Sequence, residues 1–200
     1  MTTFDDRAPE WDTPERFERA QEIARAVRDA VPLTPATRVF EVGAGTGLLG
    51  LALADTVGSV VLADASTGML AIADGKIRAA GLGHVTTRRL ELTVDPLPED
   101  RFDLVVSMLA LHHVADTAAG FAALRDLLAP GGRLAIIDLD AEDGTFHTDP
   151  DAPVHHGLDR DHLAALARTA GFGDLAFRTV FSIEKQGRAY PLFLLTATLA

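Results

Sequence analysis

Three glycines and two acidic residues carry the clearest chemical signal in this chain. Residues 41–47 read EVGAGTG after a short β-branched run, and Asp64 ends a second apolar run seventeen residues past Gly47. Glycine has no Cβ, so it lets a strand turn tightly into a helix and lets the backbone approach a ligand closely. The pattern therefore predicts a ligand-binding loop between a strand and a helix, with the Asp64 carboxylate beside it.

The spacing of the glycines argues against a dinucleotide ligand. The dinucleotide fingerprint is G-x-G-x-x-G, because a pyrophosphate needs the third glycine and an open helix N-terminus. Here the third place is Leu48, and the spacing is G-x-G-x-G with Glu41 two residues before the first glycine. A carboxylate at that position would repel a phosphate, so it suits a ligand that carries positive charge.

Five segments in a fixed order extend this pattern down the chain. EVGAGTG is followed by VVLADAS at 60–66, RLELT at 89–93, RFDLVVSMLALHHV at 101–114 and LLAPGGRLAIIDLD at 127–140. On these segments the chain resembles the class I S-adenosylmethionine-dependent methyltransferases, in the form of a small type-11-like domain. The resemblance covers roughly residues 39–140.

The resemblance implies S-adenosylmethionine as the cofactor and assigns residues to it. Asp64 would take both ribose hydroxyls, while Glu91 and Leu92 would meet the adenine. The spacing from Leu92 to Pro98 departs slightly from the family pattern. The expected cofactor-binding residues are Glu41, Gly43, Ala44, Gly45, Gly47, Asp64, Ala65, Met69, Glu91, Leu92 and Ser107.

The acceptor side of the site is less specific in the sequence. His112 and His113 follow the fourth strand, and His112 is the candidate general base, although adjacent histidines in such a loop also serve as structural hydrogen-bonding residues. The expected substrate-contacting residues are Trp11, His113, Asp138, Asp140 and His147. Residues 138–147 begin like a calcium loop, but Asp143 stands where a glycine is required, so no metal site is expected.

Composition limits the class of protein. The 200 residues suit one methyltransferase domain over 1–200, with an N-terminal lead-in and helix at 1–32, a cofactor-binding core at 38–140, and a lid-like loop, helix and terminal hairpin at 141–200. The net charge of -11, from 18 basic against 29 acidic residues, disfavours nucleic acid as a partner. There is no cysteine, basic leader or membrane-length apolar run, so we expect a cytoplasmic protein without a membrane partner; the oligomeric state stays open.

Strand and helix patterns alternate along the chain. The strands are expected at 38–42, 59–63, 85–92, 102–107 and 133–139, the helices at 14–31, 48–55, 68–80, 118–128 and 160–170, and a hairpin at 177–200. Such alternation predicts an α/β fold with a doubly wound, mostly parallel, Rossmann-like sheet of seven strands, whose last strand is antiparallel because it belongs to the C-terminal hairpin.

The expected function is S-adenosylmethionine-dependent methyl transfer to a small-molecule acceptor by in-line displacement. Three alternatives stay open at this point: a methyltransferase that acts on protein or RNA, a non-catalytic S-adenosylmethionine-binding module, and an NAD-type oxidoreductase, which the glycine spacing disfavours.

Overall fold

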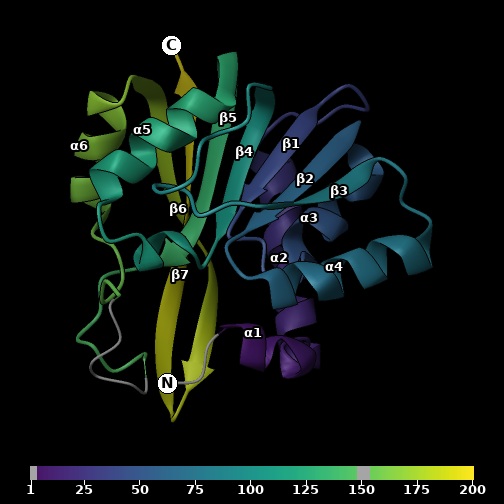
Figure 1. Cartoon of the computed structure of the whole chain (residues 1–200). Coiled ribbons are helices and arrows are strands. Elements are labelled where there is room, and N and C mark those ends of the chain that lie inside the picture. The colour runs from purple at the N-terminus through teal and green to yellow at the C-terminus, as the bar shows by residue number, and fades with distance from the viewer. Residues whose placement is uncertain (1–3, 148–153) are drawn as a thin grey trace.

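A seven-stranded sheet lies between two layers of helices (Figure 1). The computed structural model describes residues 4–147 and 154–200. The strand order is β3-β2-β1-β4-β5-β7-β6. The strands are β1 Arg38–Val42, β2 Ser59–Asp64, β3 Val85–Arg89, β4 Phe102–Met108, β5 Leu128–Leu139, β6 Phe172–Lys185 and β7 Arg188–Leu199. Strands β1 to β5 pair in parallel, whereas β7 is antiparallel to both β5 and β6, so the expected fold class is confirmed.

Helices cover both faces of the sheet, and the central strands β1, β4 and β5 carry buried apolar side chains on both sides. The helices are α1 Phe4–Arg7, η1 Ala8–Glu10, α2 Pro14–Ala30, α3 Leu48–Leu53, η2 Ala54–Thr56, α4 Thr67–Ala80, η3 Leu111–His113, α5 Thr117–Leu127 and α6 Arg160–Thr169. On β1, Val39 packs into a core shared with α2, α3 and α4, while its neighbour Phe40 packs into a second core with α5 and α6. Alternation along one strand thus feeds two hydrophobic cores.

The helix starts follow side-chain caps that are visible in the sequence. Thr13 accepts a hydrogen bond from Arg16 N at the start of α2, and Ser66 accepts one from Met69 N at the start of α4. Asp116 and Asp159 cap α5 and α6 in the same way. Of these four helices, α4 starts directly after a strand, whereas α5 and α6 follow longer connections.

Several element boundaries differ from the expected ones. β3 ends at Arg89 rather than at 92, because the Asp95 carboxylate accepts a hydrogen bond from Glu91 N and turns the chain away. β5 begins at Leu128, earlier than 133, and β6 at Phe172, earlier than 177. Helices α1, η1 and η3 were not expected. Residues 1–3 of the expected lead-in and 148–153 of the expected lid-like loop lie outside the described residues.

Pro191 lies inside β7 without breaking the sheet. Its carbonyl accepts a hydrogen bond from Asp140 N at 3.0 Å, just past the end of β5, while its partner in β6 is Ser182. Because β5 ends at Leu139, the proline, which has no N–H, lies at the end of the β5–β7 ladder rather than in its middle. Among the described helices, none combines the length and the apolar character that a membrane span requires.

Candidate active site

The turn from β1 into α3 brings three glycines with positive φ to the carboxyl end of the sheet. Gly43, Gly45 and Gly47 have φ of 66°, 55° and 80°. A Cβ on Gly43 would lie 2.2 Å from the Ala110 Cβ, so the loop can pack against the segment after β4 only because it lacks side chains there. Ala44 N donates to Ala63 O at 2.9 Å, which fixes the loop to β2. The expected tight, backbone-exposing turn is what the structure has.

Asp64 closes this loop from the end of β2. Its Oδ2 accepts a hydrogen bond from Gly45 N at 2.7 Å and its Oδ1 accepts one from Ser66 N at 2.8 Å. Burial raises the pKa of Asp64, and the bonds from Ser66 and Gly45 oppose that effect. Each carboxylate oxygen keeps a further lone pair, so a vicinal diol can still donate to both oxygens. The remaining acceptor positions of the Asp64 carboxylate therefore fit the two hydroxyls of a ribose.

Glu41 lies deeper than the sequence suggested. The side chain is 1% exposed, and Oε2 accepts a hydrogen bond from Gly50 N in α3 at 2.9 Å. Burial raises the pKa of Glu41 to about 8, so the protonated form predominates at neutral pH. In this state Glu41 ties β1 to α3 rather than presenting a charge. Its expected role toward a cationic ligand stays a prediction.

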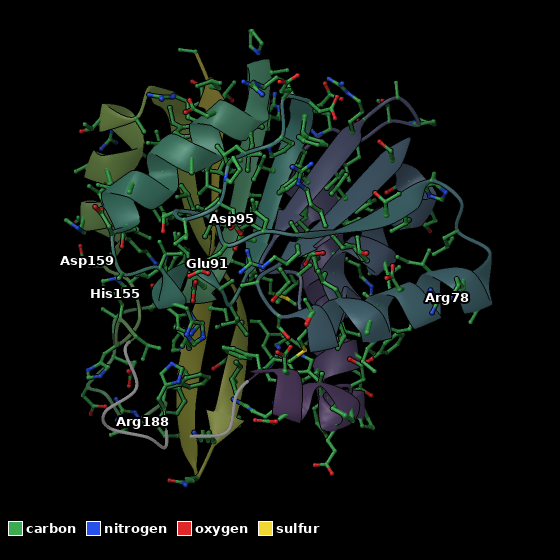
Figure 2. The ribbon with its side chains drawn as sticks, viewed as in Figure 1. Arg78, Glu91, Asp95, His155, Asp159 and Arg188 are labelled. Carbon is green, nitrogen blue, oxygen red and sulfur yellow. The ribbon has the colours of Figure 1, made fainter. Side chains whose placement is uncertain are left out.

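The residues expected to contact an adenine differ in how deeply they are buried. Leu92 and Met69 are buried, at 7% and 1% exposure, whereas the Glu91 side chain is half exposed and lies 3.6 Å from Arg89 (Figure 2 labels Glu91 beside Asp95). Ala65 is exposed next to Asp64, and Ser107 is buried at the end of β4. A contact between any of these residues and an adenine stays a prediction.

The lead-in folds over the glycine loop. Trp11 approaches Gly45 so closely that a Cβ there would lie 3.7 Å from the indole Nε1. Asp12 accepts a hydrogen bond from Thr46 at 2.5 Å and pairs with Lys76 of α4 at 2.8 Å. These contacts join segments more than thirty residues apart and carry no local motif, although Trp11 itself was expected near the substrate.

Asp5 fastens the same lead-in to the start of α4. Its Oδ1 accepts hydrogen bonds from Ser66 Oγ at 2.6 Å and from Gly68 N at 2.7 Å, and these bonds lower its pKa. No local pattern indicates this contact, because it joins residues 63 positions apart.

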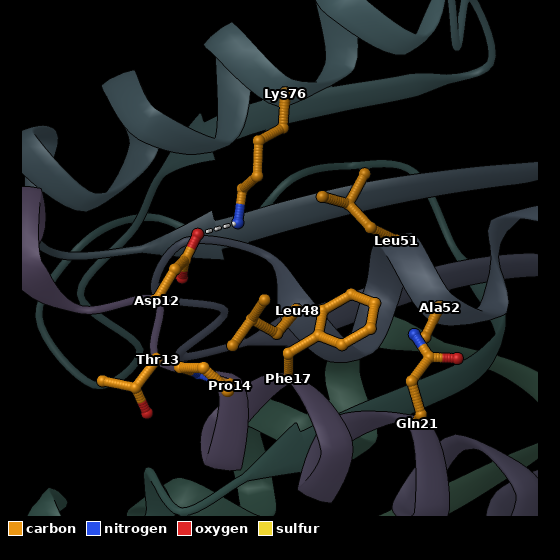
Figure 3. Close-up of a pocket in the computed structure, with 9 residues that line it drawn as sticks. All are labelled: Asp12, Thr13, Pro14, Phe17, Gln21, Leu48, Leu51, Ala52 and Lys76. Carbon is orange, nitrogen blue, oxygen red and sulfur yellow. Dashed lines mark hydrogen bonds and ion pairs between the residues drawn. The ribbon is translucent and has the colours of Figure 1, made fainter.

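A groove of about 430 Å³ lies between α2, α3 and α4 (Figure 3). Phe17, Leu48 and Leu51 give it an apolar lining, and the Asp12–Lys76 pair stands at its side. The groove includes neither Asp64 nor a histidine. We therefore place the candidate active site at the carboxyl ends of β1, β2, β4 and β5, where open α/β sheets bind ligands.

His112 and Asp138 form a buried pair at the ends of β4 and β5. The His112 Nδ1 lies 2.6 Å from Asp138 Oδ1, and His112 N donates to Asp138 Oδ2 at 3.2 Å. The two side chains are 2% and 0% exposed. A carboxylate at Nδ1 favours the Nδ1–H tautomer, which leaves the Nε2 lone pair as an acceptor. His112 Nε2 has no hydrogen-bond partner within the described part of the chain.

Two further histidines stack on this pair. The rings of His113 and His147 lie with centroids 4.2 Å and 5.2 Å from that of His112. Desolvation by the surrounding atoms is the main cause that lowers the pKa of His113 to about 4, and the nearby His112 and His147 add to it. By surface area the residue is nevertheless exposed. Burial likewise lowers the pKa of His147. At neutral pH both imidazoles are therefore uncharged, and the structure brings the expected His113 and His147 to His112.

The structure does not bring Asp140 into this cluster. Its carboxylate accepts two hydrogen bonds from Arg160 of α6, both at 2.6 Å. Asp143 pairs with Arg188 of β7, and this pairing lowers its pKa to about 2. Across residues 4–147 and 154–200, no group of three or more His, Asp or Glu side chains is arranged to hold a metal ion.

The family model and two relatives that match this chain all represent methyltransferases. Residues 39–132 match a family model described as a methyltransferase domain. A demethylmenaquinone methyltransferase of Beutenbergia cavernae is 36% identical over 129 residues, which are 64% of this chain and 49% of that protein. The chain thus spans about half the length of that relative, and 51% of a Clavibacter sepedonicus protein with the same name.

Solved structures share the whole fold. A SAM-dependent methyltransferase from Aquifex aeolicus superposes with a TM-score of 0.73 at 22% identity and covers 98% of both chains. A phosphoethanolamine N-methyltransferase of Haemonchus contortus, solved with S-adenosyl-L-methionine, gives a TM-score of 0.73 at 18% identity over 89% of this chain and 52% of that one. At these identities the likeness establishes the fold.

Proposed function

The chain belongs to the class I S-adenosylmethionine-dependent methyltransferases, and from this membership we propose that it transfers a methyl group from S-adenosylmethionine to a small-molecule acceptor. The observation that carries the proposal is the Asp64 carboxylate held against Gly45 N at the end of β2. It supplies acceptors for a ribose beside a loop whose backbone a ligand can approach. The cytoplasmic location stays a prediction from the sequence.

The cofactor would be held by the glycine loop and by the first turn of α4. Gly43, Gly45 and Gly47 give the approach, Asp64 takes the ribose, and Leu92 and Met69 border the adenine in this proposal. When bound, S-adenosylmethionine supplies an activated methyl group on a sulfonium. The protein is then left to align the acceptor and to exclude water.

The histidine cluster would act on the acceptor. Asp138 holds the His112 ring, and the Nε2 lone pair can accept a proton from an acceptor hydroxyl or amine that attacks the methyl group. His113 and His147 are uncharged at neutral pH, so they do not repel a proton that moves to His112. We therefore propose His112 as the general base and Asp138 as its positioning residue.

The domain organisation is part of the same proposal. We propose a single domain in which residues 38–140 hold the cofactor, while the lead-in and the segments after 140 enclose the acceptor. The relatives are named for demethylmenaquinone, a small molecule, which supports a small-molecule acceptor over a macromolecule.

Calorimetry tests the cofactor assignment. The protein should bind S-adenosylmethionine and S-adenosylhomocysteine and should give no heat with NAD. Absence of S-adenosylhomocysteine binding would contradict the proposed function. Conversion of S-adenosylmethionine to S-adenosylhomocysteine that depends on an added acceptor then separates an enzyme from a binding module.

A further inference from the structure

Two arginines, Arg7 and Arg16, flank the one tryptophan of the chain, and a third, Arg19, follows along the same helix as Arg16. The Arg7 and Arg16 guanidinium carbons lie 4.9 Å and 4.1 Å from the Trp11 ring centroid, and Arg16 Nη1 donates to Trp11 O at 2.6 Å. Arg19 follows Arg16 by one turn of α2, and the positive charge of Arg16 reaches it strongly enough to lower its pKa. We call Arg7, Arg16 and Arg19 the arginine cluster.

The arginine cluster lacks anionic partners in an acidic protein. Arg38, Arg89, Arg125, Arg160 and Arg188 each pair with a carboxylate. Over the residues that the structure describes, no carboxylate forms an ion pair with a member of the cluster, and the Arg19 Nε is buried without a hydrogen-bond partner. Eight other arginines also form no ion pair among the described residues, so the buried Arg19 Nε is what distinguishes the cluster. A buried donor without an acceptor costs free energy, which a bound anion would offset.

The pKa values of Arg16 and Arg19 also indicate that the cluster lacks a counter-ion. Burial and then the charge of Arg16 together lower the pKa of Arg19 to about 10. Burial and then Arg7 lower the pKa of Arg16, while Asp12 and Glu15 oppose that effect. Asp12, however, is already engaged by Thr46 and Lys76. The three guanidiniums therefore repel one another without a dedicated counter-ion.

The cluster begins beside the candidate acceptor site. Arg7 lies 5.7 Å from the Phe4 ring centroid, and the Phe4 ring meets the His113 ring edge-on at 5.4 Å. The charge of Arg7 is also one cause of the lowered pKa of His113. A molecule that reaches the histidine cluster thus passes close to a guanidinium.

We propose that the arginine cluster binds a carboxylate of the methyl acceptor. This inference rests on the proposed function and adds a substrate class to it. A planar guanidinium matches a carboxylate with two parallel hydrogen bonds, and Arg19 Nε has such a bond to give. An uncharged quinone ring would leave the cluster unpaired, so the acceptor differs in this respect from the one for which the curated relatives are named.

A matched pair of probes tests this inference. Protein saturated with S-adenosylhomocysteine is titrated by calorimetry, at constant ionic strength, with 1-hydroxy-2-naphthoate and with its neutral amide, 1-hydroxy-2-naphthamide. We expect the wild type to bind the carboxylate at least tenfold more tightly than the amide. Arg19→Gln should abolish that preference. Arg25→Gln, an exposed change on the same helix, should keep it.

Two results would overturn the inference while leaving the proposed function intact. In the first, the wild type binds S-adenosylhomocysteine but binds the two probes equally well or binds neither of them. The other is an Arg19→Gln protein that loses affinity for S-adenosylhomocysteine tenfold but keeps its affinity for methylthioadenosine, which lacks the amino-acid part. That pattern would assign the cluster to the cofactor's own carboxylate. Failure of the wild type to bind S-adenosylhomocysteine would instead contradict the proposed function.

Discussion

The Asp64 side chain both fixes the glycine loop and keeps acceptor positions for a ligand. It holds Gly45 N and Ser66 N at once, so the glycine loop and the start of α4 are set relative to each other before any ligand arrives. Such preorganisation reduces the ordering cost of binding. The same carboxylate then needs only its remaining lone pairs for a ribose.

Replacement of Asp64 by alanine should weaken cofactor binding at least tenfold. Charge-assisted hydrogen bonds are worth roughly 1.5 to 3 kcal/mol each, and the variant loses those to the ribose as well as the fixed loop. Calorimetry with S-adenosylhomocysteine measures the effect, and thermal unfolding shows whether the variant is folded. Unchanged affinity in a folded variant would remove Asp64 from the ribose.

Gly45→Val should abolish cofactor binding while most of the fold survives. The φ of 55° strains any residue with a Cβ, and a branched side chain would enter the space toward Trp11. Gly75→Val on the exposed side of α4, where a Cβ meets nothing within 4 Å, is the matched control. Normal S-adenosylhomocysteine affinity in Gly45→Val would show that the loop does not approach the cofactor.

His112→Ala should lower the methyl-transfer rate about 10²- to 10⁴-fold with little change in cofactor affinity. Asp138→Asn should lower the rate as well, because the amide no longer fixes the Nδ1–H tautomer. His112→Gln, which keeps a polar side chain but cannot accept the proton, should lower the rate by a similar factor. A variant that keeps the wild-type rate would leave His112 with a structural role.

At the scale of elements, Glu41 is the link between strand β1 and helix α3. Because the sequence shows only an acidic residue before a glycine, the pattern favours a charged carboxylate. The structure instead buries the side chain against Gly50, where a Cβ would lie 2.5 Å from Glu41 Oε2. Glycine at position 50 therefore belongs to the same contact, and it lies outside the glycine motif that the sequence drew attention to.

The raised pKa of Glu41 gives a pH dependence with a defined sign. The folded protein holds the proton up to about pH 8, whereas the unfolded chain releases it near pH 4.5. Stability should therefore fall as the pH rises from about 5 to 8, by roughly 2 to 4 kcal/mol from this group. Glu41→Gln keeps an acceptor for Gly50 N and should flatten that fall in urea unfolding at pH 5 and pH 8. An equal loss of unfolding free energy between pH 5 and pH 8 in both proteins would contradict the raised pKa of Glu41.

The elements that follow local rules were predictable, and those that depend on distant contacts were not. Thr13 and Pro14 indicated the start of α2, and the apolar run at 102–107 indicated a buried strand. The end of β3 was missed because Asp95, after the strand, captures Glu91 N. The lead-in contacts of Asp5 and Asp12 were missed because only the folded sheet brings α4 to them.

At the scale of the whole molecule, the parallel sheet explains why candidates scattered over the sequence meet. Asp64 ends β2, Asp138 lies next to the last residue of β5, and His112 lies in η3 just after β4; the carboxyl ends of these three strands share one edge. That much follows from the strand order. The strand order does not determine which side chains face the site. Asp138 pairs with His112, whereas Asp140, two residues later, pairs with Arg160.

The position of β7 has a consequence for how the protein is made. β6 contacts the sheet only through β7, and β7 fills the place between β6 and β5. During synthesis, β5 therefore presents an open edge with its ladder groups unpaired until residue 199 has left the ribosome. The nascent chain can complete the cofactor half of the sheet early, but it stays exposed to edge-to-edge association until its final strand inserts.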